Sequence, residues 1–361
     1  MASIINELRD RQVDFTLIHT GQHYDNNMSN SFFGELELPS PTINLEIGSG
    51  TQAEQTATAL VRLEEAFRNF SPDFVLVEGD TNSVLAGALA ASKLGIKVGH
   101  VEAGLRSYDL RMPEEHNRRL TDHLSNYLFA PTTRAASTLR AESCWGSVYV
   151  TGNTIIDACV RYGPKARRVS PIMSRIPFEE YALATIHRAE NVDNPSILRE
   201  LVELFRRSPV PVVYPVHPRT KERLVSVGLW DDLENCPDVV LLPPVTYFDF
   251  LTLLMNCNFV LTDSGGVQEE TSAPNIRKKS FVLRESTERP EAVEAGFSEV
   301  VGTKAEKILT RMKEFLGENW VPPIESPFGD GTAGLRIVSA IESEGFISRA
   351  GLNAMAQIES P

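Results

Sequence analysis

The chain has 361 residues, a length typical of two domains. Hydrophobic residues make up 42% of it and charged residues 23%, which excludes disordered and fibrous proteins and leaves an ordinary globular class. The formal net charge is −13, and no run of Lys and Arg is long enough to follow a phosphate backbone. A nucleic-acid partner is therefore not expected.

The cysteines and the hydropathy indicate the compartment. The four cysteines are scattered without a C-x-x-C pair, as expected of thiols in a reducing environment: Cys144, Cys159, Cys236 and Cys257. No Cys/His/carboxylate spacing resembles a zinc site, so no metal is expected. No apolar stretch reaches the ~18 residues of a membrane helix, and no basic-then-apolar leader is visible. We expect a cytoplasmic protein with no membrane partner.

Short apolar runs alternate with longer amphipathic segments almost from end to end. The runs predict strands at 13–19, 74–77, 96–101, 127–129, 148–150, 181–186, 211–216, 239–242, 259–261 and 281–283. Helical patterns include 2–11, 54–70, 83–94, 194–207 and a last helix from 331 to about 343. This alternation predicts an α/β protein with parallel sheets covered by helices on both faces.

A polar, basic and proline-containing stretch at 162–171 interrupts the pattern, and we place the domain boundary there. The N-terminal domain then spans 1–163 and the C-terminal domain 164–330. We leave open that the helix at about 331–345 packs back on the first domain. The tail at 346–361 shows no clear periodicity.

Four polar side chains lie at, or just beyond, the ends of successive predicted strands: Asp80, Glu102, Glu114 and His187. Taken singly, each has a structural alternative, such as a helix N-cap for Asp80 or an ion pair with Arg106 or Arg118 for Glu102. Glu114 and Glu115 follow Pro113 at a predicted helix start, where an acidic side chain stabilises the helix dipole. We assign this structural role to Glu115. Open α/β sheets bind ligands at the carboxyl ends of their strands, so we interpret the four as an acid–base group facing one crevice.

A second group indicates an anion site. Ser264, Gly265 and Gly266 form a strand-to-helix turn whose backbone N–H groups suit a phosphate, with a plain tight turn as the alternative. Glu270 follows one helical turn later and could bind ribose hydroxyls, and Arg289 is a candidate phosphate clamp. The sequence lacks G-x-G-x-x-G and G-x-x-x-x-G-K-[ST], which argues against a dehydrogenase or a P-loop enzyme.

Taken in order, these motifs resemble the non-hydrolysing UDP-N-acetylglucosamine 2-epimerase family from about residue 1 to 345. They include Gly79-Asp-Thr-Asn82, His100-Val-Glu-Ala-Gly-Leu-Arg106, Met112-Pro-Glu-Glu115, His187-Arg-Ala-Glu-Asn191 and Asp263-Ser-Gly-Gly-Val-Gln-Glu-Glu270. The resemblance implies a GT-B-like fold, two Rossmann-like doubly wound domains with a cleft between them. It also implies a homodimer that needs neither a metal nor a nicotinamide cofactor.

The implied reaction interconverts UDP-N-acetylglucosamine (UDP-GlcNAc) and UDP-N-acetylmannosamine (UDP-ManNAc). UDP is eliminated to give 2-acetamidoglucal and is then added back. By resemblance, Asp80, Glu102 and Glu114 are the catalytic carboxylates and His187 is a catalytic, phosphate-contacting histidine. The remaining implied contacts are Ser264, Gly265, Gly266 and Arg289 for phosphate, Glu270 for ribose and Phe250 for the uracil side.

Two features depart from the family pattern. Gln22, His23, Arg188 and His217 match parts of a second UDP-GlcNAc site that activates bacterial members, but the stretch after His23 differs, and activation stays open. The family also begins with a strand ending in Gly-Thr-Arg-Pro-Glu, which is missing here. We therefore expect the chain as written to be unstable or weakly active, with its natural start upstream.

Other functions remain as alternatives. The first is 2-epimerisation of a related UDP-sugar, such as UDP-2,3-diacetamido-glucuronic acid or a 6-deoxy sugar, which the sequence does not separate from UDP-GlcNAc. A GT-B glycosyltransferase, a non-catalytic UDP-sugar sensor and a hydrolysing epimerase are further alternatives. The presence of all four candidate catalytic residues argues against the sensor.

Overall fold

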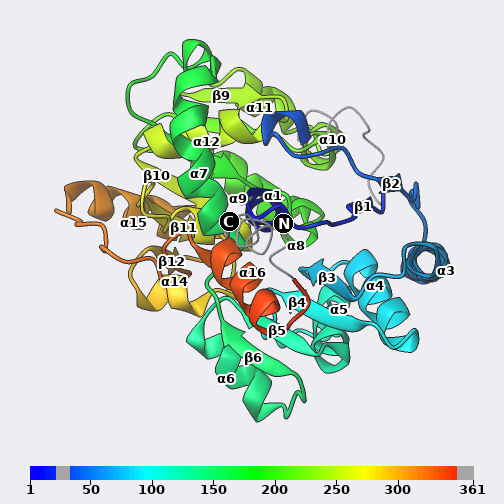
Figure 1. Cartoon of the computed structure of the whole chain (residues 1–361). Coiled ribbons are helices and arrows are strands. Elements are labelled where there is room, and N and C mark those ends of the chain that lie inside the picture. The colour runs from blue at the N-terminus through cyan, green and yellow to red at the C-terminus, as the bar shows by residue number, and fades with distance from the viewer. Residues whose placement is uncertain (22–32, 348–361) are drawn as a thin grey trace. The chain divides into compact units, whose positions relative to one another are not determined.

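The computed structural model describes residues 1–21 and 33–347, which fall into two compact units (Figure 1). Unit 1 comprises Met1–Asp157 and the segment from Gly331 onward, and unit 2 comprises Ala158–Asp330. The division falls inside helix α7 (Thr154–Val169), a few residues before the boundary predicted from composition.

Unit 1 is built on a parallel sheet of order β3-β4-β5-β6. Its strands are β3 (Phe74–Glu78), β4 (Lys97–Val101), β5 (Tyr127–Ala130) and β6 (Ser147–Val150). A separate parallel pair joins β1 (Ile18–His19) to β2 (Ile43–Asn44). The strand predicted at 13–19 was too long, because its partner β2 is only two residues long and pairs only with the last two residues of that run.

The helices of unit 1 bury mostly small or apolar residues, except the helix at 113–124, which buries a polar face made of Glu115, Asn117, Arg118, Thr121 and Asp122. They are α1 (Ala2–Asp10), α3 (Gln52–Phe70), α4 (Asn82–Lys93), α5 (Pro113–Leu124), α6 (Thr133–Ala141), the start of α7, and α16 (Ala333–Ser343). Helix α3 begins with a capping box between Thr51 and Glu54. The first turn of α16 is fixed by Asp157, whose carboxylate accepts from the N–H groups of Ala333 and Gly334 at 2.9 and 2.7 Å. Its first turn is thereby tied to the start of α7.

Unit 2 contains a six-stranded parallel sheet of order β12-β11-β10-β7-β8-β9. The strands are β7 (Ala182–Thr185), β8 (Val212–Pro215), β9 (Val239–Leu242), β10 (Phe259–Thr262), β11 (Lys279–Val282) and β12 (Ser298–Val300). The chain builds outward from β7 in one direction and from β10 in the other. The carboxyl ends of β7 and β10 therefore form the topological switch point, where doubly wound sheets bind ligands.

Helices cover this second sheet over an aromatic-rich core. They are α8 (Ala189–Val192), α9 (Pro195–Arg206), α10 (Pro218–Ser226), α11 (Trp230–Glu234), α12 (Tyr247–Asn256), α13 (Gly265–Glu270), α14 (Pro290–Glu294), α15 (Ala305–Gly317) and the 3-10 turn η1 (Ile172–Arg175). Phe259 packs edge-on against Phe281, with ring centroids 5.4 Å apart. The buried Tyr214 hydroxyl donates to the carbonyl of Ile186 at 2.9 Å, which fixes the chain just after β7.

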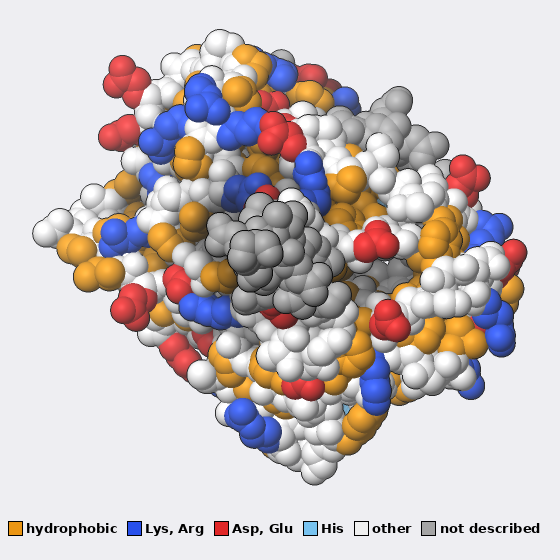
Figure 2. Space-filling model, in the orientation of Figure 1, with side chains coloured by type: hydrophobic (Ala, Val, Ile, Leu, Met, Phe, Trp, Pro, Cys, Tyr) orange, Lys and Arg blue, Asp and Glu red, His pale blue; other side chains and the backbone are white. Residues whose placement is uncertain are grey.

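Charged side chains of both signs are interspersed over the face seen in the space-filling view (Figure 2). Within residues 1–21 and 33–347, no helix combines the length and the apolar character needed to cross a membrane.

Candidate active site

In unit 1, Asp80 lies in the turn between β3 and α4. Gly79 before it has φ +90°, a left-handed conformation that favours glycine. The Asp80 carboxylate accepts from the Arg118 guanidinium at 2.5 Å, and its backbone carbonyl accepts from the Asn117 amide at 3.0 Å. Arg118 is buried and also binds Glu115, one turn earlier on α5, at 2.9 Å. Helix α5 therefore orients Asp80 while about a third of the aspartate side chain stays exposed.

Glu102 follows β4 with φ +71°, a left-handed conformation that is costly for a residue with a side chain. Its carboxylate lies against the Asp80 turn, since a Cβ on Gly79 would be 3.8 Å from Glu102 Oε2. Gly104, at φ +85°, fixes the next part of the loop, because a Cβ there would lie 2.3 Å from the Ala135 carbonyl oxygen. The strained backbone of Glu102 is thus held by close packing behind it.

A buried histidine, His100, fixes the turn that precedes Asp80. His100 on β4 contacts Asp122 through Nδ1 at 2.7 Å and the Gly79 carbonyl through Nε2 at 2.8 Å. Asp122 also binds Arg106 at 2.7 Å. Burial disfavours a charged ring, but Asp122 and the Gly79 carbonyl outweigh it and raise the pKa of His100. Burial likewise opposes the charge on Asp122, yet His100 and Arg106 lower the pKa of that carboxyl.

The two glutamates at the start of α5 differ in their surroundings. Glu115 is fully buried and accepts from the Ser107 N–H at 2.8 Å as well as from Arg118. Glu114 is partly exposed, and within the described part of the chain its carboxylate has no hydrogen-bond partner. Glu115 therefore holds the loop after β4 in place, and Glu114 is the accessible member of the pair.

In unit 2, His187 and Asp263 meet at the switch point, directly after Ile186 and β10. The Asp263 carboxylate is buried and accepts from the N–H groups of His187 and Arg188 at 3.2 and 3.0 Å and from the Asn191 amide at 3.0 Å. The His187 Nδ1 lies 3.5 Å from the same carboxylate. Asp263 thus orients the histidine, whose side chain remains 46% exposed with Nε2 on the opposite edge of the ring.

Arginine and glutamate side chains form a largely buried network beside this point. Glu288 binds both Arg188 and Arg284. Burial opposes its charge, but Arg188, Arg284 and then Arg289 lower the pKa of Glu288 to about 2. Arg289 in turn binds Glu269 at 2.5 Å. Arg284 also binds Glu190 at 2.7 Å, so the three guanidinium groups are matched by three carboxylates and the network is close to neutral.

The turn predicted to hold a phosphate adjoins this network. Ser264 precedes α13, and its N–H donates to the Thr262 hydroxyl at 3.0 Å. A Cβ on Gly265 would lie 3.5 Å from the Arg289 guanidinium carbon. The backbone of 264–266 and the Arg289 side chain therefore face one another at van der Waals distance.

Glu270 ends α13 with its carboxyl buried beside the Tyr247 hydroxyl. Burial raises the pKa of Glu270 to about 8, with Glu269 adding to the rise and the Tyr247 hydrogen bond opposing it. At neutral pH this carboxyl is mostly protonated and can donate as well as accept a hydrogen bond. Phe250 is half-buried on α12, the helix that carries Tyr247.

The residues assigned to an activator site are placed only in part. His217 caps α10 by accepting from the Arg219 N–H at 3.3 Å, and its ring centroid lies 6.3 Å from that of His187. Burial, His187 and Arg219 lower the pKa of His217. Arg188 belongs to the Glu288 network. Gln22 and His23 lie outside the described residues.

Comparison with known proteins decides the family. A family model described as UDP-N-acetylglucosamine 2-epimerase matches residues 6–342. The chain belongs to this family. A UDP-N-acetylglucosamine 2-epimerase from Methanococcus maripaludis is 44% identical over 355 residues, 95% of each chain.

Two further relatives bear on fold and substrate. The crystal structure of the Methanocaldococcus jannaschii UDP-GlcNAc 2-epimerase in complex with UDP-GlcNAc and UDP has a TM-score of 0.87, at 44% identity and 95% coverage of each chain. The expected GT-B-like fold with two Rossmann-like domains is thereby confirmed. A Pseudomonas aeruginosa UDP-2,3-diacetamido-2,3-dideoxy-D-glucuronate 2-epimerase is 38% identical, covering 93% of this chain and 94% of the relative.

Sequence reasoning missed several residues that hold the candidate site residues. Asp263 was visible in the Asp-Ser-Gly-Gly motif, directly after an apolar strand, and that position signals a buried acceptor for loop N–H groups. The structure pairs Arg106 with Asp122 and Arg118 with Asp80. Nothing in the spacing indicated these partners.

Proposed function

We propose that this chain catalyses the reversible epimerisation of UDP-GlcNAc at C2, giving UDP-ManNAc by elimination of UDP and its re-addition to 2-acetamidoglucal. The observation that carries the proposal is the presence, in a member of this family, of accessible carboxylates in unit 1 together with an oriented histidine and buried arginines in unit 2. Each set lies at the carboxyl ends of its own parallel strands.

The chemistry explains why unit 2 would hold the nucleotide. The proton at C2 of the sugar is not adjacent to a carbonyl, so its removal is made feasible by loss of UDP from C1. Negative charge then develops on the departing diphosphate. His187, Arg289 and the turn at 264–266 supply donors for that charge, and Asp263 keeps the histidine in place before the reaction begins.

The carboxylates of unit 1 would move the proton. Epimerisation requires a proton to leave one face of C2 and to arrive on the other, which needs more than one positioned acid–base group. Asp80, Glu102 and Glu114 supply three carboxylates. Arg118 fixes Asp80, and the strained backbone at Glu102 holds that side chain against the Asp80 turn.

The rest of the nucleotide has matching contacts in unit 2. Glu270, protonated at neutral pH, would donate to a ribose hydroxyl, and Phe250 on the neighbouring helix would contact the uracil side. A homodimer and a second UDP-GlcNAc bound in part by Arg188 and His217 remain proposals that rest on the family resemblance. A cytoplasmic location is a proposal that rests on the scattered cysteines.

The test is proton NMR of UDP-GlcNAc incubated with the protein in D2O. The proposal expects UDP-ManNAc to appear and solvent deuterium to replace the C2 proton in both sugars. Accumulation of free UDP and N-acetylmannosamine would instead mean a hydrolytic enzyme. No reaction with UDP-GlcNAc, together with turnover of UDP-2,3-diacetamido-glucuronic acid, would transfer the same mechanism to the substrate of the Pseudomonas relative.

A further inference from the structure

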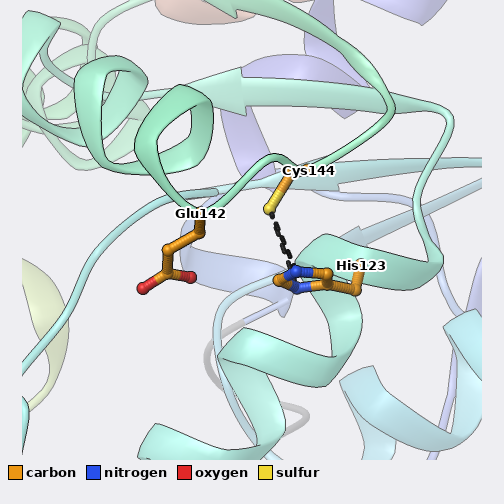
Figure 3. A group of neighbouring side chains, drawn as sticks. All are labelled: His123, Glu142 and Cys144. Atoms are coloured by element: carbon orange, nitrogen blue, oxygen red, sulfur yellow. Dashed lines mark hydrogen bonds between the residues drawn. The ribbon is translucent and has the colours of Figure 1, made fainter.

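Three metal-ligating side chains gather in unit 1, away from the residues assigned to the reaction. His123 lies in the last turn of α5, and Glu142 and Cys144 lie at the end of α6 (Figure 3). One ligand atom from each lies within 4.8 Å of the other two. Figure 3 shows the Cys144 sulfur pointing at the His123 ring, with the Glu142 side chain beside it.

The backbone fixes the position of the sulfur. Ser143 is left-handed at φ +56°, its N–H donates to the Arg140 carbonyl at 3.1 Å, and the Cys144 N–H donates to the Leu139 carbonyl at 3.0 Å. This is the Schellman arrangement, which ends a helix and turns the next residue back beside it. Cys144 is therefore held beside the end of α5 by a regular helix stop.

The histidine is also oriented as metal ligands usually are. Its Nδ1 lies 3.0 Å from the Arg119 carbonyl oxygen, an acceptor only, so Nδ1 carries the proton and donates it there. The lone pair is then on Nε2, and the Cys144 sulfur lies 3.8 Å from this nitrogen and 3.7 Å from Nδ1. A backbone carbonyl that binds the second ring nitrogen is the usual support of a metal-bound histidine.

We propose that His123, Cys144 and Glu142 bind one Zn²⁺ ion per chain, at a site separate from the epimerisation machinery. Tetrahedral bonds of ~2.3 Å to sulfur and ~2.0–2.1 Å to nitrogen place the two ligand atoms about 3.6 Å apart, close to the 3.8 Å found. Thiolate, imidazole and carboxylate together are the ligand types that Zn²⁺ takes, with a water in the fourth position.

Neighbouring charges determine how much each ligand would contribute to the affinity for the ion. Glu142 also binds Arg106 at 2.7 Å, and Arg119 lies 3.6 Å from it. The ion has to share this carboxylate with two cations, so Cys144 and His123 supply most of the affinity.

The site would tie two helices together. It joins the last turn of α5 to the end of α6, and α5 carries Glu114 and Arg118 in its first half. A bound ion would stabilise the far end of the helix that orients Asp80, without touching the reaction itself.

The experiment uses the whole chain, stripped with a chelator and titrated with Co²⁺ as a spectroscopic substitute for Zn²⁺. We expect one equivalent to give the visible absorption of a tetrahedral site and a near-ultraviolet thiolate-to-cobalt band, both lost on adding Zn²⁺. Cys144→Ser should abolish the thiolate band. His123→Gln removes a direct ligand and should weaken binding by more than the ~10–100-fold that loss of an outer-shell partner costs, and Glu142→Gln should weaken it less.

Matched controls separate a built site from surface binding. His116→Gln lies on the same helix as His123, and Cys236→Ser removes another partly buried thiol, so both should bind like the wild type. His123 is exposed, so its variant should fold, and far-ultraviolet circular dichroism of the metal-free proteins checks this for all variants. A band that survives Cys144→Ser, or equal affinity in the wild type and the His123 variant, would overturn the site. Zn²⁺ should also raise the thermal midpoint of the wild type and not that of Cys144→Ser.

Discussion

The two units differ in how far their candidate site residues are buried and paired. In unit 2, the arginines and glutamates near the switch point are buried and paired with one another, as in the Glu288 and Arg289 pairs. In unit 1, His100 and Asp122 form a buried pair, whereas the candidate catalytic carboxylates Asp80 and Glu114 remain partly exposed.

This difference matches the two tasks of the proposed reaction. Donors that bind a diphosphate work best when they are fixed before the ligand arrives, because no reorganisation is then needed as charge develops. Groups that move a proton must reach the reacting carbon, so they need exposure as well as orientation. We therefore assign nucleotide binding to unit 2 and proton transfer to unit 1, and the following variants test that division.

The largest expected effect is on turnover, from Asp80→Asn. Removing one acid–base group should lower kcat by ~10²–10⁴-fold. The dissociation constant of UDP should stay near that of the wild type, because the change lies in unit 1. Arg118 keeps Glu115 as a partner, so the fold should persist, which thermal unfolding can check. Equal losses in UDP affinity and kcat would contradict the division.

Two glycines provide a matched test of stability against binding. Gly104→Ala puts a Cβ 2.3 Å from a backbone carbonyl at φ +85°, and we expect it to lower the free energy of unfolding by about 2–5 kcal/mol. Gly265→Ala falls in the first turn of α13 with no contact below 3.5 Å, so stability should hardly change. Its methyl group would face the Arg289 side of the turn, so UDP affinity should fall. Thermal unfolding and UDP calorimetry on both proteins separate these outcomes.

Arg289→Lys is expected to weaken UDP binding. Lysine keeps a positive charge near Glu269 but loses the planar guanidinium beside Gly265. One charge-assisted hydrogen bond is worth ~1.5–3 kcal/mol, so UDP should bind about tenfold more weakly or worse. Arg207→Lys, at an exposed pair with Glu306, is the control and should leave the calorimetric affinity unchanged. Unchanged UDP affinity in the Arg289 variant would remove this residue from the phosphate site.

A separate prediction is a pH dependence of stability caused by Glu270. The folded protein raises the pKa of this carboxyl from an ordinary 4.5 to about 8, so the fold binds the proton more tightly than the unfolded chain does. Its contribution to stability is therefore complete below about pH 4.5 and is lost as the pH rises toward 8. Glu270→Gln, which cannot ionise, should match the wild type near pH 5 and unfold at a higher temperature near pH 8. Parallel thermal midpoints across this range would contradict the raised pKa.

Local patterns in the sequence were enough for the fold class, and the candidate site residues stay predictions. Apolar runs bounded by polar residues located β3, β4, β7 and β10, because a buried parallel strand has to be continuously apolar and its end marks the ligand edge. The helices predicted at 54–70 and 194–207 agree with α3 and α9 to within two residues. The strand predicted at 13–19 failed because pairing, and not apolar character, limits its length.

The supporting network could not be predicted, because it depends on contacts between distant parts of the chain. Arg188 and Glu288 are 100 residues apart, and His100 reaches Asp122 across a strand, a loop and a helix. The grouping of His123 with Cys144 was missed for the same reason, since no short ligand spacing exists and the fold alone brings them together.

Glu102→Gln in D2O tests the division between binding and proton transfer most directly. The two quantities to compare are the UDP dissociation constant from calorimetry and the rate at which deuterium enters C2 of UDP-GlcNAc, followed by NMR. We expect UDP binding to be retained within a few-fold, with deuterium incorporation slowed by ~10²-fold or more. Retained exchange at C2, or a loss of UDP binding that parallels the loss of exchange, would contradict the assignment of proton transfer to unit 1.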